Sequence, residues 1–211
     1  MTDAYLTIAR TAEVETEVKR SRFVAHATRV ADEEAARAVV EARRKAGWDA
    51  RHHCTAFVLG ADRMIARSND DGEPSGTAGA PILRTIQGRG LSDVVVVVSR
   101  WFGGVLLGAG GLVRAYGDAA SAALDAASTL RRARLLAIEI TVPVADAARL
   151  ENAARSRGIP VREVEWGTGA HAVIRAAVAP AEVDGVTAFV ESESHGAGRV
   201  EVGRQSWVDV R

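Results

Sequence analysis

The sequence contains a single cysteine, Cys54, in a chain of 211 residues. One cysteine excludes an internal disulfide and a structural zinc site built on cysteines. It is typical of proteins that work in a reducing compartment, so we expect a cytoplasmic protein. Lysine is almost as rare, since only Lys19 and Lys45 occur and the other basic residues are arginines.

Long apolar segments are also missing. The longest purely apolar run is Val94–Val98, which is far too short to cross a membrane. The N-terminal stretch MTDAYLTIAR lacks the apolar core of a signal peptide. We therefore expect no membrane partner.

A surplus of either charge is absent as well. The chain has 27 basic and 27 acidic residues, whereas generic nucleic-acid binders usually carry excess Lys and Arg. Any nucleic-acid contact must therefore come from a local patch. A hydrophobic content of 47% and the chain length allow one large domain or two small ones with real cores.

The C-terminal part, residues 135–211, alternates strand and helix patterns in the order βαββαβ, which is the ferredoxin-like plan. We expect strand 135–144, a helix capped by Asp146 that runs to Arg157, strands 161–166 and 171–178, a helix opened by Pro180, and a last strand 199–210.

The N-terminal part, residues 1–130, reads as a separate α/β domain, which makes the whole chain α+β. Its central strand is the apolar run in DVVVVVS, which is continuous and therefore predicts burial on both faces. The other expected elements are two strands in VETEVKRSRFVAHATRV, a helix from Asp32 to Gly47, a hairpin around 60–62, and helices near 78–87 and 110–127.

Glycine is concentrated in one region, since 11 of the 20 glycines lie between Gly72 and Gly117. Glycine-rich loops before helix starts can present several backbone N–H groups together, which favours anion binding. We predict an anion-binding surface made by the loops PSGTAGAP and FGGVLLGAGG with two arginines; its residues are Ser75, Gly76, Thr77, Arg100, Gly103, Gly104 and Arg114. The alternative is that these glycines only form tight turns.

The acidic loop SNDDGEPSG places Asp70, Asp71 and Glu73 close together. Three carboxylates could hold a hard metal ion or supply acid–base catalysis. The spacing does not match a calcium loop, and NDDG is itself a favoured turn sequence. We therefore predict no metal site, no cofactor and no catalytic residue, and keep a metal-assisted hydrolase as the alternative.

Other chemical motifs fit poorly. The glycine-rich region has no lysine for a Walker loop, and GAGGLV lacks the third glycine of a dinucleotide fingerprint. His52 and Cys54 share a face of a predicted strand, so a Cys–His nucleophilic pair is conceivable, but buried packing of Cys54 is the preferred interpretation. Ser75 does not stand in a GxSxG nucleophile elbow.

The stretches NDDGEPSGTAGAPIL and VVVVVSRWFGGVLLGAGGLVRAYG, together with KRSRFVAH and HCTAF, resemble the hallmark stretches of the YigZ/IMPACT family. The resemblance covers residues 17–124, and the C-terminal part is similar to the smaller domain of the bacterial members. It implies an N-terminal fold like the second domain of a small-subunit ribosomal protein. It also implies a C-terminal domain like the fifth domain of elongation factor G.

The resemblance implies a translation-linked regulatory or accessory protein that contacts RNA, the ribosome or another phosphate-bearing ligand. Arg100 and Arg114 would then meet phosphates, with help from Lys19 and Arg22, and the pair Trp101–Phe102 would stack on bases or pack in the core. The eukaryotic relatives carry an additional partner-binding domain, so the resemblance implies no particular regulatory protein partner. A third possibility is a protein-binding module without a ligand.

Overall fold

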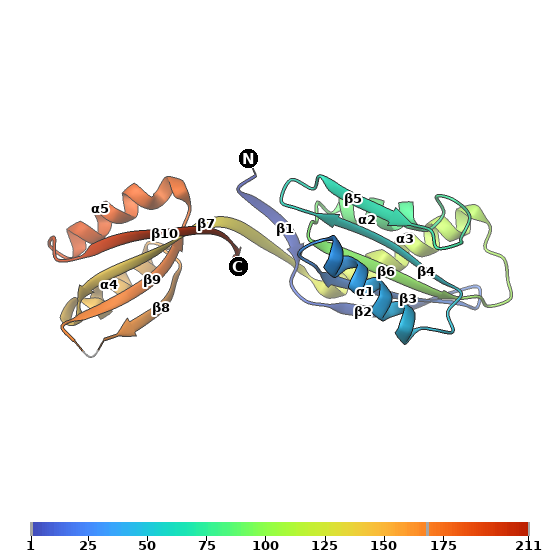
Figure 1. The fold of residues 1–211 in the computed structure, drawn as a ribbon, viewed down its shortest axis with the longest axis horizontal. Helices are drawn as coiled ribbons and strands as arrows, with labels where there is room; N and C mark the ends of the chain where they lie inside the picture. The colour runs from blue at the N-terminus through green and yellow to red at the C-terminus, as the bar shows by residue number, and fades with distance from the viewer. Residues whose placement is uncertain (1, 168, 211) are drawn as a thin grey trace. The chain divides into compact units, whose positions relative to one another are not determined.

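The computed structural model describes residues 2–167 and 169–210 of the chain (Figure 1). They divide into a first unit, which contains the residues up to Arg132 together with Val210, and a second unit, Ala133–Asp209. Each unit has its own hydrophobic cluster, and the chain mixes helices with sheets. No described helix is long and apolar enough to cross a membrane.

The first unit is built on a five-stranded antiparallel sheet. The strand order is β2 (Ala12–Val18), β3 (Ser21–Arg29), β6 (Val94–Trp101), β4 (His52–Leu59) and β5 (Ile65–Asn69). Three helices accompany it: α1 (Glu33–Ala46), α2 (Gly79–Gly88) and α3 (Ala109–Ala127). Every neighbouring pair in this sheet is antiparallel.

The central strand β6 explains the apolar run of the sequence. Val95 and Val97 pack in one cluster with Val39 and Val40 of α1. Val94, Val96 and Val98 point the other way into the cluster that holds the inner faces of α2 and α3. All five valines are fully buried, and burying each contributes about 1.5–3 kcal/mol. The prediction of a strand covered on both faces is therefore confirmed.

Helix α1 begins and ends where the sequence predicts. Oδ1 of Asp32 accepts a hydrogen bond of 2.8 Å from the backbone N–H of Ala35, which satisfies one free amide at the helix start. Gly47 follows the last turn, and its N–H donates to the carbonyl of Arg43. Because α1 ends just before Gly47, the segment that follows lies at the end of the sheet where β6 ends.

The second unit contains β7 (Thr129–Pro143), α4 (Val144–Ser156), β8 (Val161–Trp166), β9 (His171–Val178), the short helix η1 (Pro180–Glu182), α5 (Val183–Glu193) and β10 (Arg199–Val210). The helix–strand order is βαββαβ, as the sequence pattern predicts. In the sheet β7 lies between β10 and β9, and β8 is next to β9. The helices α4 and α5 supply Leu150 and Phe189 to its core.

Three details differ from the predictions. Helix α4 begins directly after β7 with Pro143 at its N-cap position, so Asp146 lies in the first turn and accepts from Arg149 instead of capping the helix. Strand β1 (Ala4–Ile8), which pairs with β7, is absent from the elements that the sequence predicts. The stretch 131–134, expected between the two domains, lies inside β7, because this strand continues without a break from one unit into the other.

Candidate functional site

The acidic loop of the first unit places its three carboxylates in three different environments. Asp70 lies before the N-terminus of α2 and accepts hydrogen bonds from the backbone N–H groups of Gly76 (2.8 Å), Ala78 (3.0 Å) and Gly79 (2.8 Å). Burial alone would raise the pKa of Asp70, but these amides lower it below its ordinary value of 3.8. The amides of the predicted anion cradle are thus occupied by a carboxylate of the same chain.

Asp71 ties the loop to α1 and β4. Its Oδ1 lies 2.5 Å from Nη2 of Arg44, and its Oδ2 accepts from the backbone N–H of His53 at 2.6 Å. The carbonyl of Asp71 also lies 2.7 Å from Nδ1 of His52. Asp71 has a positive φ of 45°, a backbone conformation that few residues other than glycine adopt. These bonds fix the loop against the start of β4.

Glu73 is buried, and it binds a cation and a hydroxyl. Its Oε1 accepts from Nη1 of Arg100 at 2.6 Å and from the hydroxyl of Tyr116 at 2.7 Å. Nε2 of His52 lies 4.0 Å from the same oxygen. Burial raises the pKa of Tyr116, which therefore stays a hydrogen-bond donor. The pairing explains why a carboxylate and a guanidinium can both lie inside the protein.

Arg100 connects this carboxylate to the hairpin of β2 and β3. Its Nη2 donates to Oγ of Ser21 at 3.2 Å, and the same oxygen accepts from the N–H of Gly103 at 3.3 Å. Arg100 is only 6% exposed, and its Nε has no hydrogen-bond acceptor within the part of the chain that the structure describes. The predicted surface arginine is therefore an interior residue, because the middle strand β6 carries it between β3 and β4.

Cys54 is a core residue, which agrees with the interpretation preferred from the sequence. Its Sγ donates to the carbonyl of Asp70 at 3.0 Å. Burial raises the pKa of the thiol to about 12, so the thiolate needed by a nucleophile is not available near neutral pH. A nucleophilic role with His52 is thus not supported.

A pocket of about 380 Å³ opens above Glu73 and Arg100. Its walls come from the start of β4, the acidic loop, the loop after β6 and the first turn of α3. The lining residues are Arg51, His52, Gly72, Glu73, Pro74, Arg100, Phe102, Leu106, Leu107, Gly108, Ala109 and Leu112. The two glycine-rich stretches of the sequence therefore do meet, although through other residues than those predicted.

The seven predicted anion-binding residues are distributed over several surroundings. Arg100 alone among them lines the pocket. Ser75 and Gly76 are exposed, whereas Thr77 is buried and bonds the carbonyl of Pro74. Gly104 and Arg114 are exposed on the loop and on α3, and Gly103 is half-buried. Their joint role in binding an anion stays a prediction.

Sequence reasoning missed three members of the polar network. Tyr116 lies on the buried face of α3, and the sequence gives no sign that its hydroxyl reaches Glu73. Ser21 carries no motif, and the sequence indicates His52 only as a partner of Cys54. The signal that could have found them is the alternation of β3 and β4, since strands that flank β6 place these residues beside Arg100.

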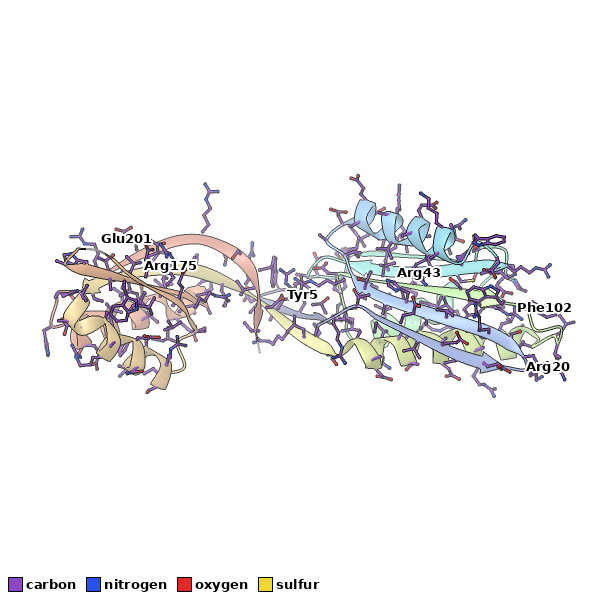
Figure 2. All side chains as sticks on the ribbon, turned by 90° about the horizontal axis from the view of Figure 1, so that it is seen from below. Tyr5, Arg20, Arg43, Phe102, Arg175 and Glu201 are labelled. Atoms are coloured by element: carbon purple, nitrogen blue, oxygen red, sulfur yellow. The ribbon has the colours of Figure 1, made fainter. Side chains whose placement is uncertain are left out.

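A second feature of the first unit is a surface that we call the basic–aromatic end: Lys19, Arg20, Arg22, Trp48, Arg51, Trp101 and Phe102. The guanidinium carbon of Arg22 lies 3.8 Å from the ring centroid of Trp101, its partner across β3 and β6. Trp48 is 83% exposed and Phe102 is 41% exposed. Figure 2 shows Arg20 and Phe102 at the same end of this unit.

Contacts between the elements hold this end together. A Cβ on Gly47 would lie 3.4 Å from the ring of Trp101, which places the segment with Trp48 beside it. A Cβ on Gly103 would lie 2.0 Å from the backbone of Arg20, so the loop after Phe102 touches the β2–β3 turn. Arg51 donates its N–H to the carbonyl of Arg100 at 3.0 Å. Three chain segments therefore form one surface.

Comparisons with known proteins agree with this architecture. A solved structure described as the crystal structure of a hypothetical protein is 33% identical, with a TM-score of 0.64 over 97% of this chain and 98% of that one. The IMPACT family member YvyE of Bacillus subtilis is 37% identical over 79% of this chain and 76% of its own length. The IMPACT family member YigZ of Escherichia coli is 44% identical over 63% of this chain and 66% of its own length.

The family match lies on the unit that holds the site. Residues 19–124 match the family described as the Impact N-terminal domain. They include the acidic loop, the pocket and the basic–aromatic end, and they agree with the stretches that carry the resemblance in the sequence. The chain is a member of the IMPACT family.

Proposed function

We propose that the protein is a translation-linked accessory protein that binds single-stranded RNA through the basic–aromatic end of its first unit. Membership in the IMPACT family, a family related to translation regulation, supports the link to translation. The observation that carries the RNA contact is the stack of Arg22 on Trp101 beside the exposed ring of Phe102. A single strand needs both kinds of group side by side, because cations bind its phosphates and aromatic rings stack on its bases.

The aromatic side chains supply the sequence-tolerant part of the binding. Trp48 and Phe102 both expose ring surface, and base stacking on such rings contributes about 1–3 kcal/mol per base. Ring surface that stays open to solvent is available to a second planar group. These two side chains therefore favour a flat aromatic ligand.

The turn between β2 and β3 presents two cations under backbone strain. Lys19 and Arg20 have φ values of 47° and 64°, and Val18 pairs with Ser21 across them. A two-residue hairpin turn of this kind prefers Asn-Gly, and each residue with a side chain there costs about 1–2 kcal/mol. Strain that persists at an exposed turn points to a function for the side chains it carries.

The acidic loop gives the hydrolase alternative no support. Asp70 holds the start of α2, Asp71 binds Arg44, and Glu73 binds Arg100. Among the described residues, no group of three or more His, Cys, Asp or Glu side chains is placed to hold a metal ion. The loop therefore has structural partners for each carboxylate.

A salt titration tests the RNA contact. Single-stranded RNA is titrated at several salt concentrations with the parent and with Arg20→Ala, Arg22→Ala and the control Arg84→Ala, an exposed arginine of α2. For a single strand the slope of log affinity against log salt changes by about 0.7 for each phosphate that the protein no longer neutralises. We expect Arg20→Ala and Arg22→Ala to flatten the slope by about that amount and to weaken all sequences alike. Absence of binding by the parent, or equal slopes for all four proteins, would refute the proposal.

A further inference from the structure

The pocket above Glu73 combines three chemical surfaces in one cavity. Glu73 and Arg100 form its polar floor. Phe102, Leu106 and Leu107 form an apolar wall, and Gly108 and Ala109 lie at its rim. A volume of about 380 Å³ lies within the range of pockets that hold small organic ligands.

The floor offers a carboxylate oxygen to a ligand. Within the described residues, both hydrogen bonds that the Glu73 side chain accepts, from Arg100 and Tyr116, end on Oε1. Oε2 therefore keeps its lone pairs, although the side chain of Glu73 is only 4% exposed. Nε of Arg100 is buried without an acceptor in the same part of the chain, and Oε2 of Glu73 is not among the buried atoms that lack a partner there. A carboxylate oxygen that accepts no hydrogen bond from the described residues favours a ligand that brings N–H groups.

The rim offers positive potential. Helix α3 begins there at Ala109, and its N-cap residue Gly108 has no side chain to accept from the first amides. This differs from α1, whose first turn is capped by Asp32, and from α2, whose first turn bonds Asp70. The start of a 19-residue helix carries a partial positive charge, and the basic residue Arg51 lines the same pocket. An anionic group, such as a phosphate, is therefore favoured at the rim.

We propose that this pocket binds one unstacked guanine nucleotide of an RNA strand, a step that rests on the RNA binding proposed above. The N1–H and the amino group of guanine both donate toward Oε2 of Glu73, the ring packs on Phe102, and the phosphate lies at the start of α3. Adenine presents an acceptor at N1, which a carboxylate repels. Uracil offers one N–H between two carbonyl groups. The basic–aromatic end, which includes Arg51 and Phe102, delivers the strand to the pocket.

The experiment compares two short RNA strands that are identical except for one base. Both consist of uridines, and one carries a single guanine where the other carries adenine. We expect the parent to bind the guanine strand about tenfold more tightly, the order of discrimination that a good bidentate base contact gives. Glu73→Gln, which replaces one acceptor by a donor, should abolish this preference.

A second variant covers the case in which Glu73→Gln does not fold. Ala109→Glu places a negative charge at the rim on an exposed residue, and Ala38→Glu makes the same change on the exposed side of α1. We expect Ala109→Glu to weaken the guanine strand at least tenfold more than Ala38→Glu does.

The two proposals fail differently. Equal binding of both strands by the parent, with Ala109→Glu behaving like Ala38→Glu, would overturn the guanine pocket and leave RNA binding at the basic–aromatic end intact. A parent that binds neither strand would overturn both. A parent that prefers adenine would also refute the assignment of Glu73 as the base-reading acceptor.

Discussion

Nη1 of Arg100 lies 2.6 Å from Oε1 of Glu73, and the two side chains are only 7% and 4% exposed. The pair joins the acidic loop to the central strand of the first unit. In such a buried pair the loss of water around both charges is costly, and the remaining partner is left without compensation when the other is removed.

Removing one member should therefore cost more than replacing both. We expect Glu73→Ala to lower the free energy of unfolding by about 3–5 kcal/mol, because it leaves a buried guanidinium unpaired. The double change Glu73→Leu with Arg100→Met should lose less than Glu73→Ala or Arg100→Met alone. Urea unfolding followed by circular dichroism measures all four proteins. A double variant less stable than both singles would contradict this account of the pair.

Asp70 should contribute stability that depends on pH. Its folded-state pKa lies below the ordinary 3.8, so the contribution is fully present above that value and is lost as the pH falls from 3.8 through the folded-state pKa. At neutral pH we expect Asp70→Asn to destabilise the protein by about 0.3–1 kcal/mol, the usual contribution of a negative charge near a helix N-terminus. The difference from the parent should shrink in acid. Asp62→Asn, on an exposed turn, serves as the control and should change little at any pH.

His53 should produce a second pH dependence at milder acidity. Burial lowers the pKa of this histidine from 6.5, and its Nδ1 lies 2.8 Å from Oγ of Ser99. A lowered pKa means that the unfolded chain takes up the proton first, so stability falls as the pH drops below 6.5. We expect His53→Gln to flatten the stability profile below that value, with part of the slope retained by His26, whose pKa burial also lowers. Thermal unfolding between about pH 5 and 7.5 measures this dependence of stability on pH. His171 is exposed, and His171→Gln should keep the parent's profile.

The turn at Lys19–Arg20 should trade stability for binding. Replacing it by Asn-Gly puts at both positions a residue that tolerates left-handed backbone, and we expect the fold to gain about 1 kcal/mol or more. The same change removes two cations, so RNA affinity should fall. Glutamine at both positions is the matched control, because it removes the charges and keeps the strain. If Asn-Gly and the glutamine pair show the same unfolding temperature, the turn is not strained by its side chains.

Much of the first unit could be predicted from patterns that act locally. The buried β6 follows from an unbroken run of valines, and α1 follows from the capping residue Asp32 and the basic last turn. Strand β1 gives no such signal, because it is only five residues long and lies before the alternating segment of β2.

The site was predictable only in part, because its partners are far apart in the sequence. Composition identified the acidic loop and the glycine-rich stretches, and the structure brings their ends to one pocket. Composition could not reveal that Asp70 accepts hydrogen bonds from amides at the start of α2. It also could not reveal that Glu73 accepts from Arg100 and Tyr116, which are 27 and 43 positions away. Such pairings are set by strand order rather than by spacing.

Gly103 sets a constraint on how this sequence can change. The space that its Cβ would need is filled by the carbonyl carbon and oxygen of Arg20, at 2.0 and 2.1 Å. An insertion or a deletion in the β2–β3 turn would shift that backbone, and any larger residue at position 103 would push it away. Gly103 is therefore tied to the backbone and the length of the β2–β3 turn and not to its side chains, so a library that changes the length of this turn should also vary position 103.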